Sequence, residues 1–408
     1  MSKQSFTSEI SPQKTSGEKQ TQPCVGSDGK LLLKPALKPE RPFFSSGPCV
    51  KPLSWRPEPF CPAFANRSHR SVFATAFIKT LLDDTRAILN LPEGYAIVHI
   101  PGSGTGAINA LMYNLLGPRH VDLFSFEVFS RRWADEVADQ LKLPHTRHEA
   151  AFGELPDLTQ CSDDHDIVMV LNGTTSGVCV PNLDWISEKR QGLVICDAVS
   201  AIFATEIDWT KIDAMAFSWQ KTLGAEAGIG TAILSPRALQ RLEEYVPSWP
   251  LPYTVKLKGG EPFQKSLVVG GVISTPSMIT FDEMAKALAW GRSCGGVPGL
   301  MDRVENNYQV IRSWVEQTTW CQFLVRDPSI RSHIAVTLSL APMVTEKAAA
   351  WAACQKISDL LAGENAAFDI MNHSHAPPSL RIWCGPTVET EDLQRLCHWL
   401  DWAHTQIS

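Results

Sequence analysis

The chain has 408 residues with a formal net charge of −6, and 44% of its residues are hydrophobic. This length predicts two or three domains, and the acidic charge argues against a general nucleic-acid-binding surface. No apolar run is long enough to span a membrane, and the 11 cysteines show no CxxC pair or His/Cys metal spacing, so we expect a cytoplasmic protein with reduced thiols and no metal site.

Residues 1–42 differ in composition from the rest of the chain. Polar residues, Gly and Pro dominate this segment, and hydrophobic residues are sparse before Leu31. Such a segment cannot bury enough apolar surface to offset the entropy lost on ordering, so we predict a disordered N-terminal extension. An organelle-targeting peptide is the alternative, although arginine is absent before Arg41 and acidic residues are present, unlike the usual pattern.

Further along, short apolar runs alternate with segments of helical pattern. The runs that we predict to be buried strands are 95–100, 121–126, 166–171, 193–196, 214–217 and 230–234. Apolar strands separated by helices predict an α/β fold with a parallel sheet covered on both faces. Ligands of such sheets lie at the carboxyl ends of the strands.

The end of the chain has a different pattern. Strands are predicted over 334–338 and 380–383, and helices over 345–361 and from Thr390 onward. These elements form a small C-terminal α/β domain. The glycine-rich cluster 295–299 marks a boundary, so we predict a large domain over 43–298 and a small one over 299–408.

Two residues that follow buried strands suggest a cofactor. Asp197 ends one apolar run, and Lys221 follows the next run along the chain. These are the two groups that a pyridoxal phosphate (PLP) site needs: the amine forms a Schiff base, and the carboxylate keeps the pyridine nitrogen protonated. A single lysine after a strand is more often a solvated surface residue, so the pair carries this interpretation.

Other strand ends carry groups suited to the same cofactor. The glycine-rich turn 102–106 precedes a helix, whose N-terminus can bind a phosphate. The segment 172–177 offers hydroxyl groups, and Ser200 and Gln220 could donate to a phosphate. Each motif alone is more simply a polar or tight turn, but together they favour one phosphorylated pyridine.

Several motifs resemble those of the phosphoserine aminotransferases, a family of class V, fold-type I PLP enzymes. They are Phe44-Ser45-Ser46-Gly47-Pro48-Cys49, Ser68-His69-Arg70, Asn172-Gly173-Thr174-Thr175-Ser176-Gly177, Asp197-Ala198-Val199-Ser200, Phe217-Ser218-Trp219-Gln220-Lys221 and Leu380-Arg381-Ile382-Trp383-Cys384-Gly385. The similarity extends from about Phe43 to the C-terminus, in the family's order and spacing. It implies a large domain with a mostly parallel seven-stranded sheet, a small domain, and a homodimer with the active site at the subunit interface.

The resemblance also implies roles in holding PLP. Lys221 would carry the cofactor and move the proton between Cα and C4′, Asp197 would pair with the pyridinium nitrogen, and Thr174 would bond the ring phenolate. Phe129 would stack on the ring. The residues implied to hold the cofactor phosphate are Gly104, Thr105, Ser200 and Gln220.

Further implied roles concern the substrate and the partner subunit. Ser274 and Thr275 would reach the phosphate of the other subunit's cofactor. Arg381 would clamp the substrate α-carboxylate with its bidentate fork. His69 and Arg70 belong to the basic cluster that binds the substrate's second anionic group.

The chain departs from the family where that second anion binds. Val72, Cys179 and Ser374 stand where related sequences tend to carry Lys or Arg, and His373 and His375 could compensate in part. We therefore expect phosphate affinity to be weaker than in an ordinary member of the family. The reaction type is better determined by the sequence than the substrate is.

The expected function is transamination between phosphoserine and 2-oxoglutarate in serine biosynthesis, on small-molecule substrates. An aminotransferase for an amino acid without a phosphate is the first alternative. Sulfur transfer within the same superfamily would need a nucleophilic cysteine on a mobile loop, and no cysteine has an obvious place for it. A non-catalytic paralogue is disfavoured because both Lys221 and Asp197 are retained.

Overall fold

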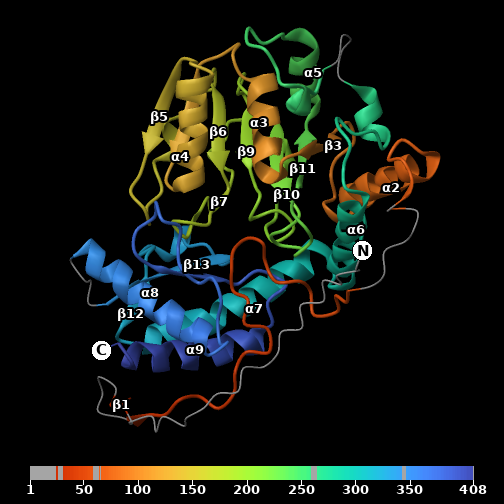
Figure 1. Cartoon of the computed structure of the whole chain (residues 1–408). Coiled ribbons are helices and arrows are strands. Elements are labelled where there is room, and N and C mark those ends of the chain that lie inside the picture. Colours follow the sequence, from red (N-terminus) through yellow and green to blue (C-terminus); the bar gives the residue numbers. More distant parts are fainter. Residues whose placement is uncertain are drawn as a thin grey trace, which may run out of the picture.

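The computed structural model describes residues 24–25, 31–57, 64, 66–258, 264–341 and 346–407. A seven-stranded sheet forms the centre of the larger unit, with the strand order β3-β11-β10-β9-β6-β4-β5 (Figure 1). Its strands are β3 (Ala96–Pro101), β4 (Val121–Ser125), β5 (His145–Glu149), β6 (Asp166–Val170), β9 (Val194–Asp197), β10 (Ala214–Ser218) and β11 (Ile229–Leu234). The pairs from β10 to β5 are parallel, and only β11 runs antiparallel to its neighbours. The predicted mostly parallel seven-stranded sheet is confirmed.

Helices pack against this sheet and bury its strands. Every residue of β4, β6, β9, β10 and β11 is buried, as expected for continuous apolar strands in an α/β fold. Helices α3 and α4 lie across one face, and α2 packs beside α6 near the β3 edge (Figure 1). The helices of the larger unit are α2 (Val72–Ile88), α3 (Ser103–Leu115), α4 (Val128–Asp135), α5 (Pro236–Glu244) and α6 (Met278–Ser293).

A second, smaller unit has its own apolar core. A three-stranded antiparallel sheet lies against three helices, below the larger unit in Figure 1. Its elements are β12 (Cys321–Phe323), β13 (Ala335–Leu340), β14 (Leu380–Trp383), α7 (Gly296–Gln317), α8 (Lys347–Gly363) and α9 (Thr390–Thr405). Trp383, Trp399 and Phe44 are fully buried in this core, which is separate from that of the larger unit.

Helix α7 connects the two units near the predicted boundary at residue 298. Leu300 packs in the larger core, whereas Val304 and Ile311 pack in the smaller one. The break between α6 and α7 requires left-handed backbone at Gly295 (φ 98°) and Gly296 (φ 69°), a conformation that glycine adopts at little cost. The division into large and small domains remains our proposal, with the transition inside the first turns of α7.

The predicted N-terminal extension is described only in part. Residues 1–23 and 26–30 lie outside the described residues, and β1 (Cys24–Val25) pairs with β2 (Leu31–Leu32). Trp399 Nε1 donates to the carbonyl of Leu37 at 2.8 Å, and Lys34 pairs with Glu364 at 2.6 Å. Disorder over residues 1–42 stays a prediction, and these polar contacts tie the end of the segment to the smaller unit.

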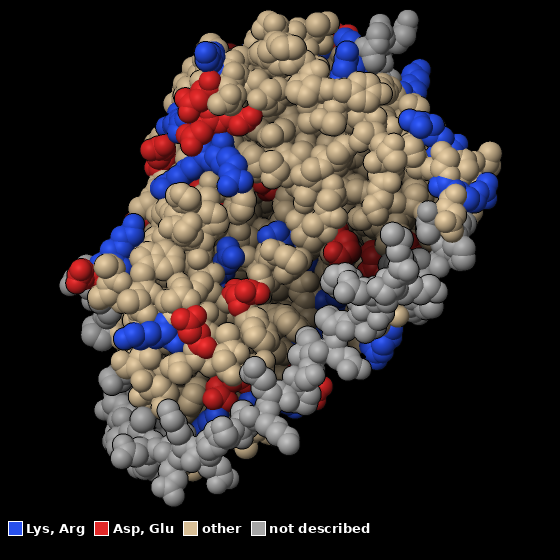
Figure 2. Space-filling view, in the orientation of Figure 1, with Lys and Arg blue, Asp and Glu red and all other residues tan. Residues whose placement is uncertain are grey.

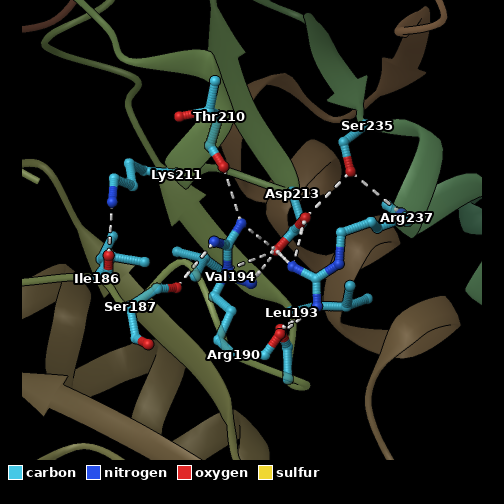
Figure 3. Close-up of polar contacts among 12 residues, drawn as sticks. Ile186, Ser187, Arg190, Leu193, Val194, Thr210, Lys211, Asp213, Ser235 and Arg237 are labelled. Carbon is cyan, nitrogen blue, oxygen red and sulfur yellow. Dashed lines mark hydrogen bonds and ion pairs between the residues drawn. The ribbon is translucent and has the colours of Figure 1, made fainter. Parts of the chain in front are cut away.

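A buried carboxylate fixes the amino-terminal ends of the neighbouring strands β9 and β10. Asp213 directly precedes β10, and its Oδ2 accepts a hydrogen bond from the N–H of Val194 in β9 at 2.9 Å. Arg190 and Arg237 pair with the same carboxylate at 3.2 and 3.0 Å (Figure 3). A buried carboxylate that is fully paired in this way makes the local structure rigid. The opposite ends of these two strands open onto the candidate active site.

Among the described residues, no helix is long and apolar enough to cross a membrane, and no group of three His, Cys, Asp or Glu side chains could hold a metal ion. The cysteines in this part of the chain are unpaired.

Candidate active site

A cavity opens at the carboxyl ends of β6, β9 and β10. Small-molecule sites in α/β folds lie at such strand ends. The cavity brings together eight residues that the sequence singled out: Gly104, Thr105, Phe129, Thr174, Asp197, Ser200, Gln220 and Lys221. They come from separate strand ends, so the parallel sheet is what assembles them.

Lys221 lies three residues past β10, and its amine points into this cavity. Its Nζ donates to the carbonyl of Ser46, and in the described residues it has no carboxylate within ion-pairing distance. Burial lowers the pKa of Lys221, and the positive charge of Arg381 lowers it further. A Cβ added at Gly47 would lie only 2.4 Å from the amine, so a larger residue there would displace the end of the Lys221 side chain. A lysine with a lowered pKa is available as an unprotonated nucleophile.

Asp197 is the last residue of β9, and both of its carboxylate oxygens are held in place. Trp133 Nε1 donates to Oδ2 at 2.8 Å, and the N–H of Val199 donates to Oδ1 at 3.0 Å. Burial raises the pKa of Asp197. A buried carboxylate in this environment gains from a cation placed beside it. The sequence analysis did not identify Trp133, although it lies one helical turn after Phe129 on α4.

The N-terminus of α3 forms another wall of the cavity. The N–H groups of Gly102 and Ser103 both donate to the carbonyl of Gly228, at 3.0 and 3.1 Å. The N–H groups of the first helical turn have no partner within the helix and can bind an anion. Val199 closes the space above Gly104, where an added Cβ would lie 2.4 Å from Val199 Cγ2.

Neutral side chains complete this wall. Gln220 Nε2 donates to Ser103 Oγ at 3.0 Å, and Asn172 Nδ2 donates to Ser200 Oγ at 2.8 Å. Together the three groups fit PLP: a free amine, a buried carboxylate without a cation, and a helix N-terminus lined by small polar residues. The residues at these positions therefore have the chemical groups that this cofactor needs.

Arg381 lies on β14 of the smaller unit, near the open side of the cavity. Its guanidinium is close enough to lower the pKa of both Lys221 and His373. Its Nε is buried and has no hydrogen-bond partner within the described parts of the chain. An unpaired buried guanidinium fits the predicted task of binding a carboxylate.

Besides Arg381, four predicted residues do not line this cavity. Ser274 and Thr275 line a different hollow, beside Ile100 in β3. His69 and Arg70 precede α2, where His69 is buried and Arg70 is exposed. One chain alone does not bring these residues to Lys221, and their roles in a partner's site remain predictions.

The three uncharged positions of the sequence analysis differ in environment. Val72 is 84% exposed at the first turn of α2, and Ser374 is exposed in the loop before β14. Cys179 is in β8 (Val178–Cys179), its thiol donates to the carbonyl of Arg331 at 3.5 Å, and burial raises its pKa to about 11. Burial likewise raises the pKa of Cys49 to about 12. Protonated, buried thiols are poor nucleophiles, which argues against sulfur transfer by these two cysteines.

A buried glutamate in the cavity wall was not identified from the sequence. Glu127 is fully buried, accepts hydrogen bonds from Ser130 N and Thr175 Oγ1 at 2.7 Å each, and caps the N-terminus of α4. Burial raises the pKa of Glu127 to about 7. The reciprocal pair Glu127 and Ser130 is a capping signal. It could have predicted where the helix starts, but not that Glu127 lies in the cavity wall.

Glu127 predicts a pH dependence of stability. The pKa of Glu127 is about 7 in the folded protein and 4.5 ordinarily. The protonated carboxyl therefore stabilises the folded state fully below pH 4.5, and this contribution is lost as the pH rises through 7. Relative to Glu127→Gln, the wild type should lose roughly 3 kcal/mol across this window. Thermal unfolding at pH 5 and pH 8 measures the difference, with Glu149→Gln, an exposed glutamate, as the control. Equal pH slopes for the wild type and Glu127→Gln would contradict the assignment.

Comparison with known proteins gives consistent matches over most of the chain. The family model described as aminotransferase class-V matches residues 63–396. The chain is 42% identical to the phosphoserine aminotransferase of Methanosarcina mazei, with 91% of this chain and 99% of the relative covered. The corresponding protein of Methanosarcina barkeri is also 42% identical, with 92% and 100% covered.

Solved structures show the same fold at lower identity. A phosphoserine aminotransferase from Cytophaga hutchinsonii has a TM-score of 0.74 at 22% identity, covering 89% of this chain and 98% of that one. An aspartate aminotransferase from Thermus thermophilus has a TM-score of 0.72 at 19% identity, with 90% and 99% covered. At these identities the structural likeness establishes the fold alone.

Proposed function

The chain belongs to the class V aminotransferase family and is a PLP-dependent transaminase, and we propose that it transfers the amino group between phosphoserine and 2-oxoglutarate. The observation that carries this proposal is the placement of Lys221 and Asp197 in one cavity whose third wall is the N-terminus of α3. The names of the 42% identical relatives, which match over nearly their whole length, support the choice of substrate. This reaction would place the enzyme in cytoplasmic serine biosynthesis.

PLP, when bound, supplies a conjugated ring that accepts the electron pair released at the substrate Cα. In this proposal Lys221 Nζ holds the cofactor covalently and then accepts and returns the Cα proton, a task that suits an amine whose pKa is lowered by burial. Asp197 holds a proton on the pyridine nitrogen, and Trp133 fixes the orientation of that carboxylate. Phe129 and Thr174 line the same cavity, where Phe129 would pack against the ring and Thr174 would donate to its phenolate oxygen.

The phosphate of the cofactor is assigned to the N-terminus of α3. Gly104, Thr105, Ser200 and Gln220 line that part of the cavity. Ser274 and Thr275 lie in a separate hollow of the same chain, and the proposal assigns them to the phosphate site of a second subunit. The active enzyme would then be a homodimer in which each chain completes the other's site.

For the substrate, Arg381 is assigned to the α-carboxylate, because its buried Nε has no hydrogen-bond partner among the described residues and its charge is close enough to lower the pKa of Lys221. His69 and Arg70 are assigned to the second anionic group in the partner's site. A second candidate, an aminotransferase for an amino acid without a phosphate, is favoured by one observation. Neither Val72 nor Ser374 carries a charge, and Cys179 is a buried thiol.

The substrate is tested by kcat/KM for phosphoserine, glutamate, aspartate, alanine and serine, each with 2-oxoglutarate or a matched keto acid. We expect phosphoserine to exceed serine by at least about a hundredfold, the value of two charge-assisted hydrogen bonds to the phosphate. Parity of phosphoserine with serine would favour the second candidate. Absence of activity with phosphoserine would reject the proposed substrate and leave only the reaction type.

A further inference from the structure

One arginine beside the cavity has no function in the account so far. Arg132 lies on α4, one turn after Phe129, so the two side chains share a face of the helix. The guanidinium carbon of Arg132 lies 5.2 Å from the centroid of the Phe129 ring, and Phe129 lines the cavity. Arg132 is itself exposed to solvent.

A histidine from the smaller unit lies against the same ring. The centroids of His373 and Phe129 are 6.4 Å apart, with the rings edge to face. Burial lowers the pKa of His373, and the charges of Arg381 and Arg132 lower it further. Arg132 and His373 therefore both lie against Phe129, and Arg381 is close to His373, so basic residues from both units come together here.

Arg132 has no acidic counterpart among the described residues, whereas Glu127 lies close enough to Arg381 to act on its pKa. No ion pair or side-chain hydrogen bond involves Arg132 there, and the nearby Asp135 is paired with Arg147 at 2.8 Å. The charge of Arg132 is therefore not neutralised by a carboxylate, so a bound anion would gain from it. Figure 2 shows Lys and Arg side chains within the hollow between the two units and on the upper unit above it, with Asp and Glu side chains beside them.

We propose that Arg132 is a specificity-determining residue that binds the second anionic group of the substrate, beside His373. This inference rests on the proposed function and adds Arg132 to His69 and Arg70 of a second subunit as a group that would bind the phosphate of phosphoserine when Arg381 holds the α-carboxylate. A guanidinium suits this task because its planar fork matches two oxygens of a phosphate. It also supplies positive charge close to His373, next to position 374, where the chain carries Ser.

The adjacent arginine offers a matched control. Arg131 Nη2 donates to the carbonyl of Ala150 at 3.1 Å, and its guanidinium lies over the ring of Phe152 at 4.5 Å. Arg131 is thus engaged at the β5 side of α4, away from Phe129. Changing either arginine to glutamine removes one positive charge from the same helix and keeps a good helix former.

The experiment measures equilibrium binding of 3-phosphoglycerate and of glycerate to the PLP-loaded protein by calorimetry. Both ligands carry a carboxylate and lack an amino group, so no transamination occurs. Arg132→Gln should weaken 3-phosphoglycerate binding between about tenfold and a hundredfold and leave glycerate binding unchanged. Arg131→Gln should change neither. Equal weakening by both variants, or an unchanged affinity in Arg132→Gln, would overturn the proposal.

Steady-state kinetics separate this inference from the substrate proposal. In Arg132→Gln, kcat/KM should fall for phosphoserine and stay unchanged for alanine. The wild type could show no activity with phosphoserine but a higher kcat/KM for glutamate than for alanine. If Arg132→Gln then loses this preference, the proposed substrate is wrong and Arg132 still binds the second anion. If kcat/KM falls equally for all substrates, Arg132 has no role in specificity.

Discussion

Lys221→Ala should abolish transamination, with a loss of roughly four orders of magnitude or more. The same amine is assigned two tasks, holding the cofactor covalently and moving the Cα proton, and proton transfer alone contributes up to about 10⁴-fold. Alanine leaves the buried space without an amine, and the described residues supply no second lysine to the cavity wall. The measurement is the rate of keto-acid formation from phosphoserine at saturating PLP.

The matched control is Lys79→Ala. Lys79 lies on the exposed face of α2, where it pairs with Asp83 one turn away, so its loss removes a lysine far from the cavity. This variant should retain wild-type activity. Melting temperatures of both variants distinguish lost chemistry from lost structure. Substantial activity in a folded Lys221→Ala protein would contradict the assignment of both tasks to this residue.

Asp197→Asn should retain the cofactor and lose about 2–4 kcal/mol of transition-state stabilisation, which corresponds to a fall in kcat of about 30- to 1,000-fold. An amide cannot stabilise a protonated pyridine nitrogen, whereas the buried carboxylate gains from that cation. The carboxylate accepts from both Trp133 Nε1 and Val199 N, so the amide also loses one of these two hydrogen bonds.

Trp133→Phe separates these two effects. It removes the donor to Asp197 Oδ2 but keeps the carboxylate, so its kcat should fall far less than that of Asp197→Asn. Both variants are compared by kcat and by PLP content of the purified protein. A similar loss in both would mean that orientation, rather than charge, is what Asp197 contributes. Near wild-type turnover in Asp197→Asn would show that this residue is not the pyridine partner.

The sequence allowed the sheet and the cavity to be predicted because their signals are local. Continuous apolar runs such as 166–170 and 214–217 can only be strands that are buried on both faces, and parallel strands align their carboxyl ends. Asp197 and Lys221 follow such runs directly. Their proximity to the turn at Gly104 then follows from the topology of the sheet.

Contacts between distant elements were not predictable in this way. Trp133 reaches Asp197 only because α4 packs over β6, and nothing in the local sequence of either residue encodes that packing. Arg132 and His373 meet across the two units for the same reason. The described part of the predicted tail is held by Trp399, which is more than 300 positions away in the chain.

The assignment of Lys221 as the cofactor-binding residue is tested most directly by borohydride reduction. The purified protein is loaded with PLP, reduced, digested and mapped by mass spectrometry. The account predicts a pyridoxyl adduct on the peptide that contains Lys221, and no adduct at this site in Lys221→Ala. An adduct on another lysine of the wild type, or none at all in a protein that has bound PLP, would contradict it.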